Sequence, residues 1–372
     1  MKSIVADNQP LSGVRVVDLS RHLPGPFCTW YLASLGAEVI RIERPGQGDP
    51  TRVVPPFVDG QSVFHASLNR GKASVALDTR RPSGQQALLR LIETADVVVE
   101  GFRPGTLDGT GLSPEALVEQ FPGLIVASIT GFGQTGPLAK EPGHDLNFAG
   151  YAGMIAGDGR HEPPILQVAD LAGGSLTACI GILAALLARV KTGEGRLLDV
   201  SITEGALALM APHLAMAQAE QRDFRPGMEP LSGGMAAYRV YACRDGKLLC
   251  VAPLEPKFWT SFSKTVGKTV VPTTEGLAAL FRERDRAEWV ERLSGTCITP
   301  ALGAEEVVQE AHFRARQCFE TVLGIDMVCA PFGGKTGTNV PILGQDTERI
   351  LSELDIPLQR LLEEGVAATP DG

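Results

Sequence analysis

The chain has 372 residues, of which 44% are hydrophobic and 21% are charged, and its formal net charge is -9. This length exceeds what a single hydrophobic core usually organises, so two domains are expected. The negative charge argues against a nucleic-acid surface, which needs clustered Lys and Arg, but it allows an anionic ligand held by a few cations.

Short apolar runs alternate with helical patterns in the first part of the chain. Strands are predicted at 14–19, 38–42, 73–77, 97–100, 124–129 and 196–200. Helices are predicted at 24–36, 82–95, 114–120 and 173–193, with another from Thr203. Because strands that alternate with helices form parallel sheets covered on both faces, the pattern predicts an α/β fold with a Rossmann-like parallel sheet.

The composition changes at residues 218–230, a charged segment with Pro and Gly that is interpreted as a linker. Strands at 238–242 and 248–252 then flank an RDG turn, which indicates a hairpin. Helices are predicted at 258–266, 274–281, 286–294 and 304–310, and one more is expected in the tail beyond Pro341. We therefore predict a Rossmann-like domain over 1–222, completed by 331–372, and a small α+β domain over 223–330.

Residues 171–190 are nearly free of charge and long enough to cross a bilayer. Gly, Ser and Thr interrupt this segment, and Asp170 and Arg189 bracket it, so a buried core helix is expected and no membrane association. The start of the chain lacks the apolar run of a signal peptide. The seven cysteines form no Cys-x-x-Cys pair, which favours free thiols and a cytoplasmic protein, and no dense His, Cys and carboxylate pattern predicts a metal.

Ligands of parallel sheets bind at the carboxyl ends of the strands. The segments there are SRHLPGPF, ERPGQGDPTR, EGFRPG and TGFGQTGP, with NRGKAS just before the third strand. Their glycines allow close approach of the backbone, and their cations supply charge for a polyanion. A G-x-G-x-x-G turn is absent, which disfavours a simple dinucleotide dehydrogenase.

These segments, taken with the central block QVADLAGG and the later VAPLEPKFW, resemble one family in order and spacing. It is the family III coenzyme A transferases together with their relatives, the α-methylacyl-CoA racemases. The resemblance implies the family III CoA-transferase fold and coenzyme A thioesters as substrates. It also implies an interlocked homodimer in which each chain threads through a ring made by the other.

The resemblance assigns catalytic roles to His144, to Asp170 and to Glu255. His144 lies in a Gly-His-Asp sequence at 143–145, called the GHD segment here, and the resemblance places the backbone N–H of Asp145 opposite an enolate oxygen. His and a carboxylate suit removal and return of a weakly acidic proton on opposite faces of the carbon beside a thioester. Glu255 would come from the partner chain and orient His144. The local pattern alone also allows a structural role for each residue. His144 would then be a loop residue, Asp170 a helix N-cap and Glu255 an exposed loop acid.

Five residues are predicted to contact coenzyme A: Arg41, Asn69, Arg70, Lys72 and Arg103. Arg matches phosphate with two parallel hydrogen bonds, and Lys acts as a point charge. The alternative for each cation is a solvated surface position.

The GHD segment favours a racemase or epimerase that interconverts the (R)- and (S)-forms of 2-methylacyl-CoA thioesters through an enolate. The first alternative is a transferase that moves coenzyme A between carboxylic acids, with Asp170 forming a mixed anhydride. The second is a protein that only binds acyl-CoA. The acyl chain itself stays open between branched fatty acids, sterol side chains and short 2-methyl acids.

Overall fold

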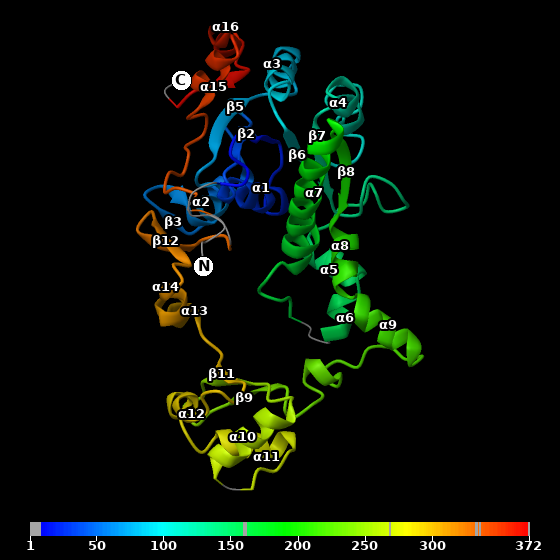
Figure 1. Cartoon of the computed structure of the whole chain (residues 1–372). Helices are drawn as coiled ribbons and strands as arrows, with labels where there is room; N and C mark the ends of the chain where they lie inside the picture. The colour runs from blue at the N-terminus through cyan, green and yellow to red at the C-terminus, as the bar shows by residue number, and fades with distance from the viewer. Residues whose placement is uncertain (1–8, 159–161, 268, 332–333, 335, 371–372) are drawn as a thin grey trace. The chain divides into compact units, whose positions relative to one another are not determined.

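A computed structural model describes residues 9–158, 162–267, 269–331, 334 and 336–370, which form two compact units (Figure 1). The first unit comprises Met1–Ala152, Pro164–Ala211 and Ala315–Gly372, and the second comprises Gly153–Pro163 and Pro212–Arg314. The contacts therefore divide the chain earlier than the predicted boundaries at 222 and 330. The later boundary moves because Val322 and Met327 pack against Ala66, which ties residues beyond 315 to the first unit.

The first unit is built on a seven-stranded sheet in the order β14-β5-β2-β1-β6-β7-β8. Its strands are β1 (Arg15–Asp18), β2 (Glu38–Glu43), β5 (Ala73–Leu77), β6 (Val97–Glu100), β7 (Ile125–Thr130), β8 (Arg196–Ser201) and β14 (Ala367–Ala368). All neighbours pair in parallel except β14, which runs antiparallel to β5. The six parallel strands follow the Rossmann order, so the α/β prediction is confirmed, while the antiparallel edge strand was not predicted.

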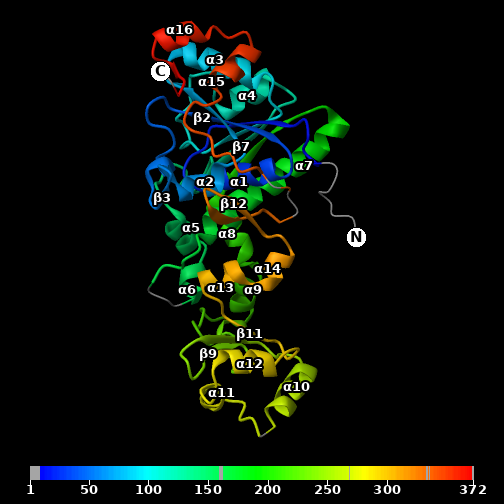
Figure 2. The ribbon, with the colours of Figure 1, turned by 90° about the vertical axis from the view of Figure 1, so that its left-hand side faces the viewer.

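Helices cover both faces of this sheet. On one face lie α3 (Pro82–Ile92), α4 (Pro114–Gln120), α15 (Thr347–Glu353) and α16 (Leu358–Glu363), which share one apolar core with the sheet. Figures 1 and 2 both show α3 beside α15 and α16, although more than 250 residues separate them in the chain. The other face carries α1 (Pro24–Ser34) and α7 (Thr177–Thr192).

Helix α1 starts close to the carboxyl end of β1. Pro24 stands at its first position, where a missing N–H costs no hydrogen bond. A side chain at Gly25 would meet the Ser20 Cβ at 2.1 Å, so glycine is required for this close approach. The start of α1 is therefore fixed against the loop that leaves the central strand.

A π-helix, η2 (Ala169–Leu176), runs directly into α7. The sequence had placed the start of this helix at Gly173 with Asp170 before it, so the N-cap interpretation of Asp170 is wrong. The π-helix packs closely against Gly205 of α8 (Ile202–Leu209), where a Cβ would lie 2.0 Å from the Gly173 carbonyl oxygen. The two helices touch backbone to backbone.

Within the described residues, Ala169–Thr192 is the single helical stretch whose length and apolar composition would allow it to cross a membrane. It packs on α1, β7 and β8, and 44% of its most apolar 18-residue stretch is buried. A core helix of a soluble protein passes the same test. All seven cysteines are free thiols, and the buried Sγ atoms of Cys28 and Cys179 lie 3.5 Å apart.

Shorter elements complete the first unit. They are η1 (Pro50–Val53), β3 (Phe57–Val58), β4 (Gln61–Ser62), α2 (Val63–Asn69), α5 (Asp145–Tyr151), β12 (Phe319–Val322) and β13 (Ile325–Val328). Helix α5 and the hairpin of β12 and β13 were not predicted.

The second unit is α+β, as predicted. It contains a three-stranded antiparallel sheet of β9 (Arg239–Ala242), β10 (Leu248–Val251) and β11 (Ile298–Pro300). Its helices are α6 (Met154–Asp158), α9 (Ala211–Ala219), α10 (Pro256–Val266), α11 (Thr274–Phe281), α12 (Arg286–Arg292), α13 (Ala304–Gln309) and α14 (Ala311–Ala315), with the short η3 (Pro230–Ser232). Phe262, Phe281 and Trp289 form the centre of its own core.

Candidate active site

Asp170 occupies the first turn of η2 and is half-buried. Its backbone N–H donates to Oδ1 of Asp145 at 2.9 Å. Burial, and to a lesser degree the neighbouring Asp145 carboxylate, raise the pKa of Asp170 to about 7. Near neutral pH this side chain is therefore available both as a proton acceptor and as a proton donor.

His144 lies immediately before α5 with an exposed side chain. Its backbone N–H donates to Oδ1 of Asn147 at 3.0 Å, which fixes the entry of the chain into the helix. Because Asp145 is the next residue and also binds Asp170, the fold brings three of the predicted catalytic residues into one place. The two residues predicted to transfer protons lie on different elements, His144 directly before α5 and Asp170 in η2.

The ring of Phe148 sets the position of the GHD segment. A Cβ at Gly143 would lie 2.5 Å from the Phe148 ring, and a Cβ at Gly131 would lie 2.4 Å from it. Phe148 also packs edge-on against Phe132, with ring centroids 5.2 Å apart. Gly143 is thus needed for packing inside the protein.

Glu255 stands at the N-cap of α10 in the second unit and is exposed. Its carbonyl oxygen accepts hydrogen bonds from the N–H groups of Phe258 and Trp259. Its approach to the His144 imidazole stays a prediction.

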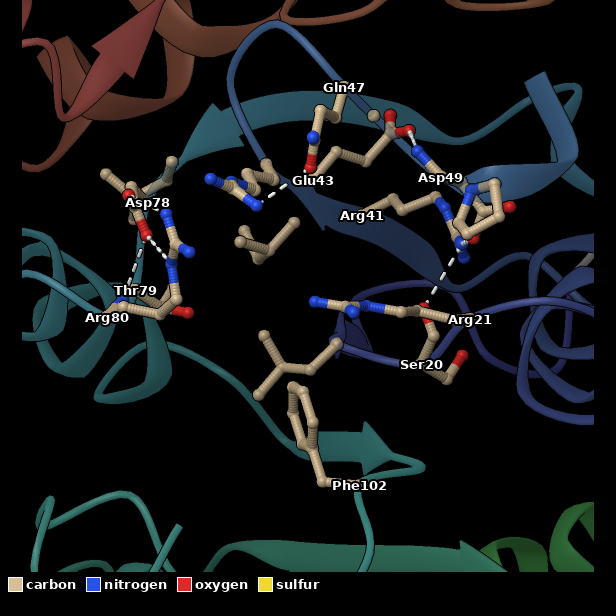
Figure 3. Close-up of a pocket in the computed structure, with 16 residues that line it drawn as sticks. Ser20, Arg21, Arg41, Glu43, Gln47, Asp49, Asp78, Thr79, Arg80 and Phe102 are labelled. Carbon is tan, nitrogen blue, oxygen red and sulfur yellow. Dashed lines mark hydrogen bonds and ion pairs between the residues drawn. The ribbon is translucent and has the colours of Figure 1, made fainter. Parts of the chain in front are cut away.

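A pocket of about 380 Å³ lies at the carboxyl ends of β1, β2, β5 and β6, where the strand order of the sheet reverses (Figure 3). Arg21, Arg44 and Arg80 line it, together with Phe102. The guanidinium of Arg44 donates to Gln47 at 2.8 Å and that of Arg80 to Asp78 at 2.6 Å. Arg21 lies over the Phe102 ring, 5.6 Å from its centroid, and Figure 3 shows its side chain extending into the pocket.

In dinucleotide-binding Rossmann domains an acidic residue binds the ribose of the ligand. Glu43 is the corresponding acidic residue here, but its carboxylate has other partners. Glu43 ends β2, but its carboxylate accepts hydrogen bonds from Arg52, from Ser74 and from the N–H of Asp49. Burial alone would raise the pKa of Glu43, but Arg52 lowers it to about 2. Glu43 therefore binds other residues of the protein and not a ribose, in agreement with the missing G-x-G-x-x-G turn.

Two of the predicted coenzyme A contacts, Arg41 and Lys72, are buried in an ionic network between the sheet and α1. Arg41 pairs with Asp18 at 3.0 Å and with Asp49, and it donates to the Ser20 carbonyl at 3.1 Å. Lys72 donates to Oγ1 of Thr29 at 2.7 Å and lies 3.5 Å from the Asp18 carboxylate. Burial lowers the pKa of Lys72 to about 7 although Asp18 opposes the shift.

Asn69 and Arg70 also have buried partners. Asn69 accepts a hydrogen bond from Lys72 at 3.0 Å. Arg70 pairs with Glu320 at 2.8 Å and donates to the Val328 carbonyl. The contacts of Arg70 attach the β12–β13 hairpin to the end of α2, and both side chains have partners inside the unit.

Arg103 differs from these four residues because it is exposed. It stands next to the pocket residue Phe102, three residues beyond the last residue of β6. Arg21 and Arg80 hold the same place after β1 and β5, and the sequence reasoning missed both. The available signal was an Arg two or three residues after the predicted strands at 14–19 and 73–77, as Arg103 follows the strand at 97–100.

No group of three or more His, Cys, Asp or Glu side chains that would hold a metal occurs in the part of the chain that the structure describes.

Comparison with known proteins identifies the family of the chain. The sequence pattern of the family described as CoA-transferase family III matches residues 11–347. The human alpha-methylacyl-CoA racemase is 33% identical over 95% of both chains. The human succinyl-CoA:glutarate CoA-transferase is 37% identical over 68% of this chain and 58% of its own. A solved CAIB/BAIF family protein from Brucella suis superposes with a TM-score of 0.83 at 30% identity, covering 94% of this chain and all of that one.

Racemases and transferases are thus similarly related to this chain. With a matched pattern that spans nearly its whole length, the chain belongs to CoA-transferase family III and is an enzyme that acts on acyl-coenzyme A thioesters.

Proposed function

We propose that the enzyme interconverts the two epimers of 2-methylacyl-CoA thioesters by proton transfer at carbon 2. The proposal rests on the half-buried Asp170. Its backbone N–H is hydrogen-bonded to Asp145, the residue that follows His144, and burial together with the Asp145 carboxylate raises the pKa of Asp170 to about 7. An acid–base group works best when its pKa lies near the working pH. The imidazole of His144 provides the second group for proton transfer at the same site.

In the proposed reaction one of the two side chains takes the proton from carbon 2, and the electron pair moves onto the thioester oxygen as an enolate. The other side chain, in its protonated form, then delivers a proton to the opposite face. The N–H of Asp145 is at the start of α5, where the first N–H groups of a helix have no partner within the helix, and it would donate to the enolate oxygen. Glu255 would accept a hydrogen bond from the His144 ring.

The alternative is transfer of coenzyme A between carboxylic acids, with Asp170 as the nucleophile. A carboxylate attacks only in its ionised form. The neighbouring His144 favours proton transfer, because a transferase needs no second acid–base group for a carbon acid, whereas inversion needs one on each face.

The homodimer belongs to the same proposal. Ile180, Leu183, Leu187 and Val190 recur along one side of α7, and all four are exposed in the single chain. Apolar stripes of this kind are usually covered by another helix. We expect a dimer in sedimentation equilibrium at assay concentrations, and a monomer there would contradict the dimer and the pairing of Glu255 with the partner's site.

Replacement of Arg103 by Ala should raise the KM for acyl-CoA roughly 10-fold while changing kcat much less. An exposed Arg beside the pocket contributes binding that is equal in the ground state and the transition state, and one charge-assisted hydrogen bond contributes about 1.5–3 kcal/mol. Steady-state kinetics measure the change. Arg90→Ala, an exposed Arg on α3, is the matched control and should leave both constants unaltered. A collapse of kcat with an unchanged KM would show that Arg103 is misplaced.

Incubation with one epimer in heavy water tests the proposed function. Deuterium should enter carbon 2 while the ratio of the two epimers moves toward one, and no second carboxylic acid should be required.

A further inference from the structure

The hydroxyl of Ser175 contacts the backbone of Asp170 from the interior of the protein. Ser175 is fully buried, and its Oγ lies 2.7 Å from the carbonyl oxygen of Pro24 and 3.0 Å from that of Asp170. A serine hydroxyl has one hydrogen, so the two contacts share it as a three-centre bond in which the shorter one dominates. Ser175 thereby ties the turn that carries Asp170 to the first residue of α1.

Both backbone groups of Asp170 are consequently held by side chains. Its N–H donates to Asp145, and its carbonyl oxygen receives the Ser175 hydroxyl. In a π-helix the carbonyl of residue i faces residue i+5, which is the relation of Asp170 to Ser175. The π-helix is a strained form that persists only where its surroundings hold it.

Neighbouring contacts leave this turn little freedom to compensate. A Cβ on Gly173 would lie 2.6 Å from the Ile202 carbonyl oxygen, and one on Gly174 would lie 2.9 Å from the Ile202 side chain. The π-helix is therefore pressed against α8 on one side, while Ser175 is its polar tie to α1. Removing the hydroxyl takes away the hydrogen bond that joins this turn to α1 and the contact with the Asp170 carbonyl oxygen.

We infer that Ser175 is a positioning residue that holds the Asp170 carboxyl in register with the substrate carbon. The inference rests on the proposed function, in which Asp170 transfers a proton on one face of carbon 2. Ser175 acts through Asp170 and does not itself touch the substrate.

Ser175→Ala should slow proton removal on the Asp170 face by about 10- to 100-fold, because a displacement of about 1 Å at a reacting group costs on this scale. The KM should change little, since the pocket at the strand ends is untouched. Proton removal on the His144 face should continue at nearly the wild-type rate. In heavy water the epimer whose proton faces His144 should then gain deuterium without inversion.

Thr177 provides the matched control. Its Oγ1 lies 3.1 Å from the Ala172 carbonyl oxygen, the same i+5 relation in the same helix, but Thr177 is exposed and this contact stays within its own helix. Thr177→Val removes that hydroxyl with little change of shape and should leave exchange on both faces unaltered.

The experiment follows deuterium uptake and inversion from each pure epimer of a 2-methylacyl-CoA with the wild type, Ser175→Ala and Thr177→Val, together with their melting temperatures. Slow exchange on one face in Ser175→Ala alone supports the positioning role. Equal loss on both faces, or no loss, overturns it. If Ser175→Ala does not fold, Ser175→Cys, which keeps a weaker donor, is measured in the same way.

A wild type that shows no exchange on either face but transfers coenzyme A would refute the racemase function separately. Ser175 would then be tested on transfer turnover: a fall in kcat at constant KM in Ser175→Ala, absent in Thr177→Val, supports positioning, and equal rates overturn it.

Discussion

Replacing His144 with Ala should lower epimer inversion by about 10²-fold or more, the usual scale for loss of a general base. Asp170→Ala should lower it by a similar factor. Each variant should keep slow exchange only on the face served by the remaining group. Deuterium uptake and chiral analysis, started from each pure epimer, measure both effects.

The pH dependence provides an independent check on Asp170. Because burial raises its pKa to about 7, the carboxyl is protonated below this pH and ionised above it. Proton removal on the Asp170 face should therefore increase as the pH rises through about 7, and this limb of the profile should vanish in Asp170→Ala. His312→Ala, an exposed histidine on α14, is the control for His144 and should retain full activity. A mild effect of His144→Ala would point to the transferase alternative.

Arg41→Ala should destabilise the fold by about 3–5 kcal/mol, because removal of one partner leaves buried charge uncompensated. Arg41 is 2% exposed and pairs with two carboxylates, those of Asp18 and Asp49. Burial alone would raise the pKa of Asp18, but Arg41 and Lys72 hold it below its ordinary value. Without Arg41 the carboxylates lose most of that compensation, and the contact between β1, β2 and α1 opens.

Chemical denaturation midpoints and the melting temperature measure this change. Arg103→Ala is the matched control, because exposed substitutions usually stay within about 0.5 kcal/mol of the wild type. If Arg41→Ala were as stable as the wild type but bound acyl-CoA poorly, Arg41 would be the coenzyme A contact that the sequence suggested, and its structural role would be minor.

The strand pattern was predictable because it depends on local apolar runs. β5, β6, α4 and α11 have the bounds that the sequence indicated. The antiparallel β14 has two residues and pairs with a strand almost 300 positions away, so no local pattern predicts it. The π-helix was equally hidden, since it lies where Gly173 meets Gly205 of another helix, a contact that no local pattern reveals.

The candidate site was predictable in location but not in the orientation of its cations. The rule that ligands bind at the carboxyl ends of strands led to the loops that line the pocket. Arg41, however, lies within β2, opposite Asp18 in the neighbouring strand, and although it lines the pocket its guanidinium is paired with Asp18 and Asp49. A charge in a buried strand calls for a partner of opposite charge, and that signal was present in the sequence. The position of Glu255 depends on the arrangement of chains in the dimer, which no pattern within one chain specifies.

The central proposal is tested most directly by incubating the wild-type enzyme with a single epimer of a 2-methylacyl-CoA in heavy water, without any added carboxylic acid. Mass and chiral analysis of the recovered thioester should find one deuterium at carbon 2 and an epimer ratio that approaches one. Hydroxylamine should leave Asp170 unmodified throughout. No deuterium at carbon 2, together with coenzyme A exchange that requires an added carboxylic acid and trapping of Asp170 by hydroxylamine, would contradict the racemase function and establish a transferase.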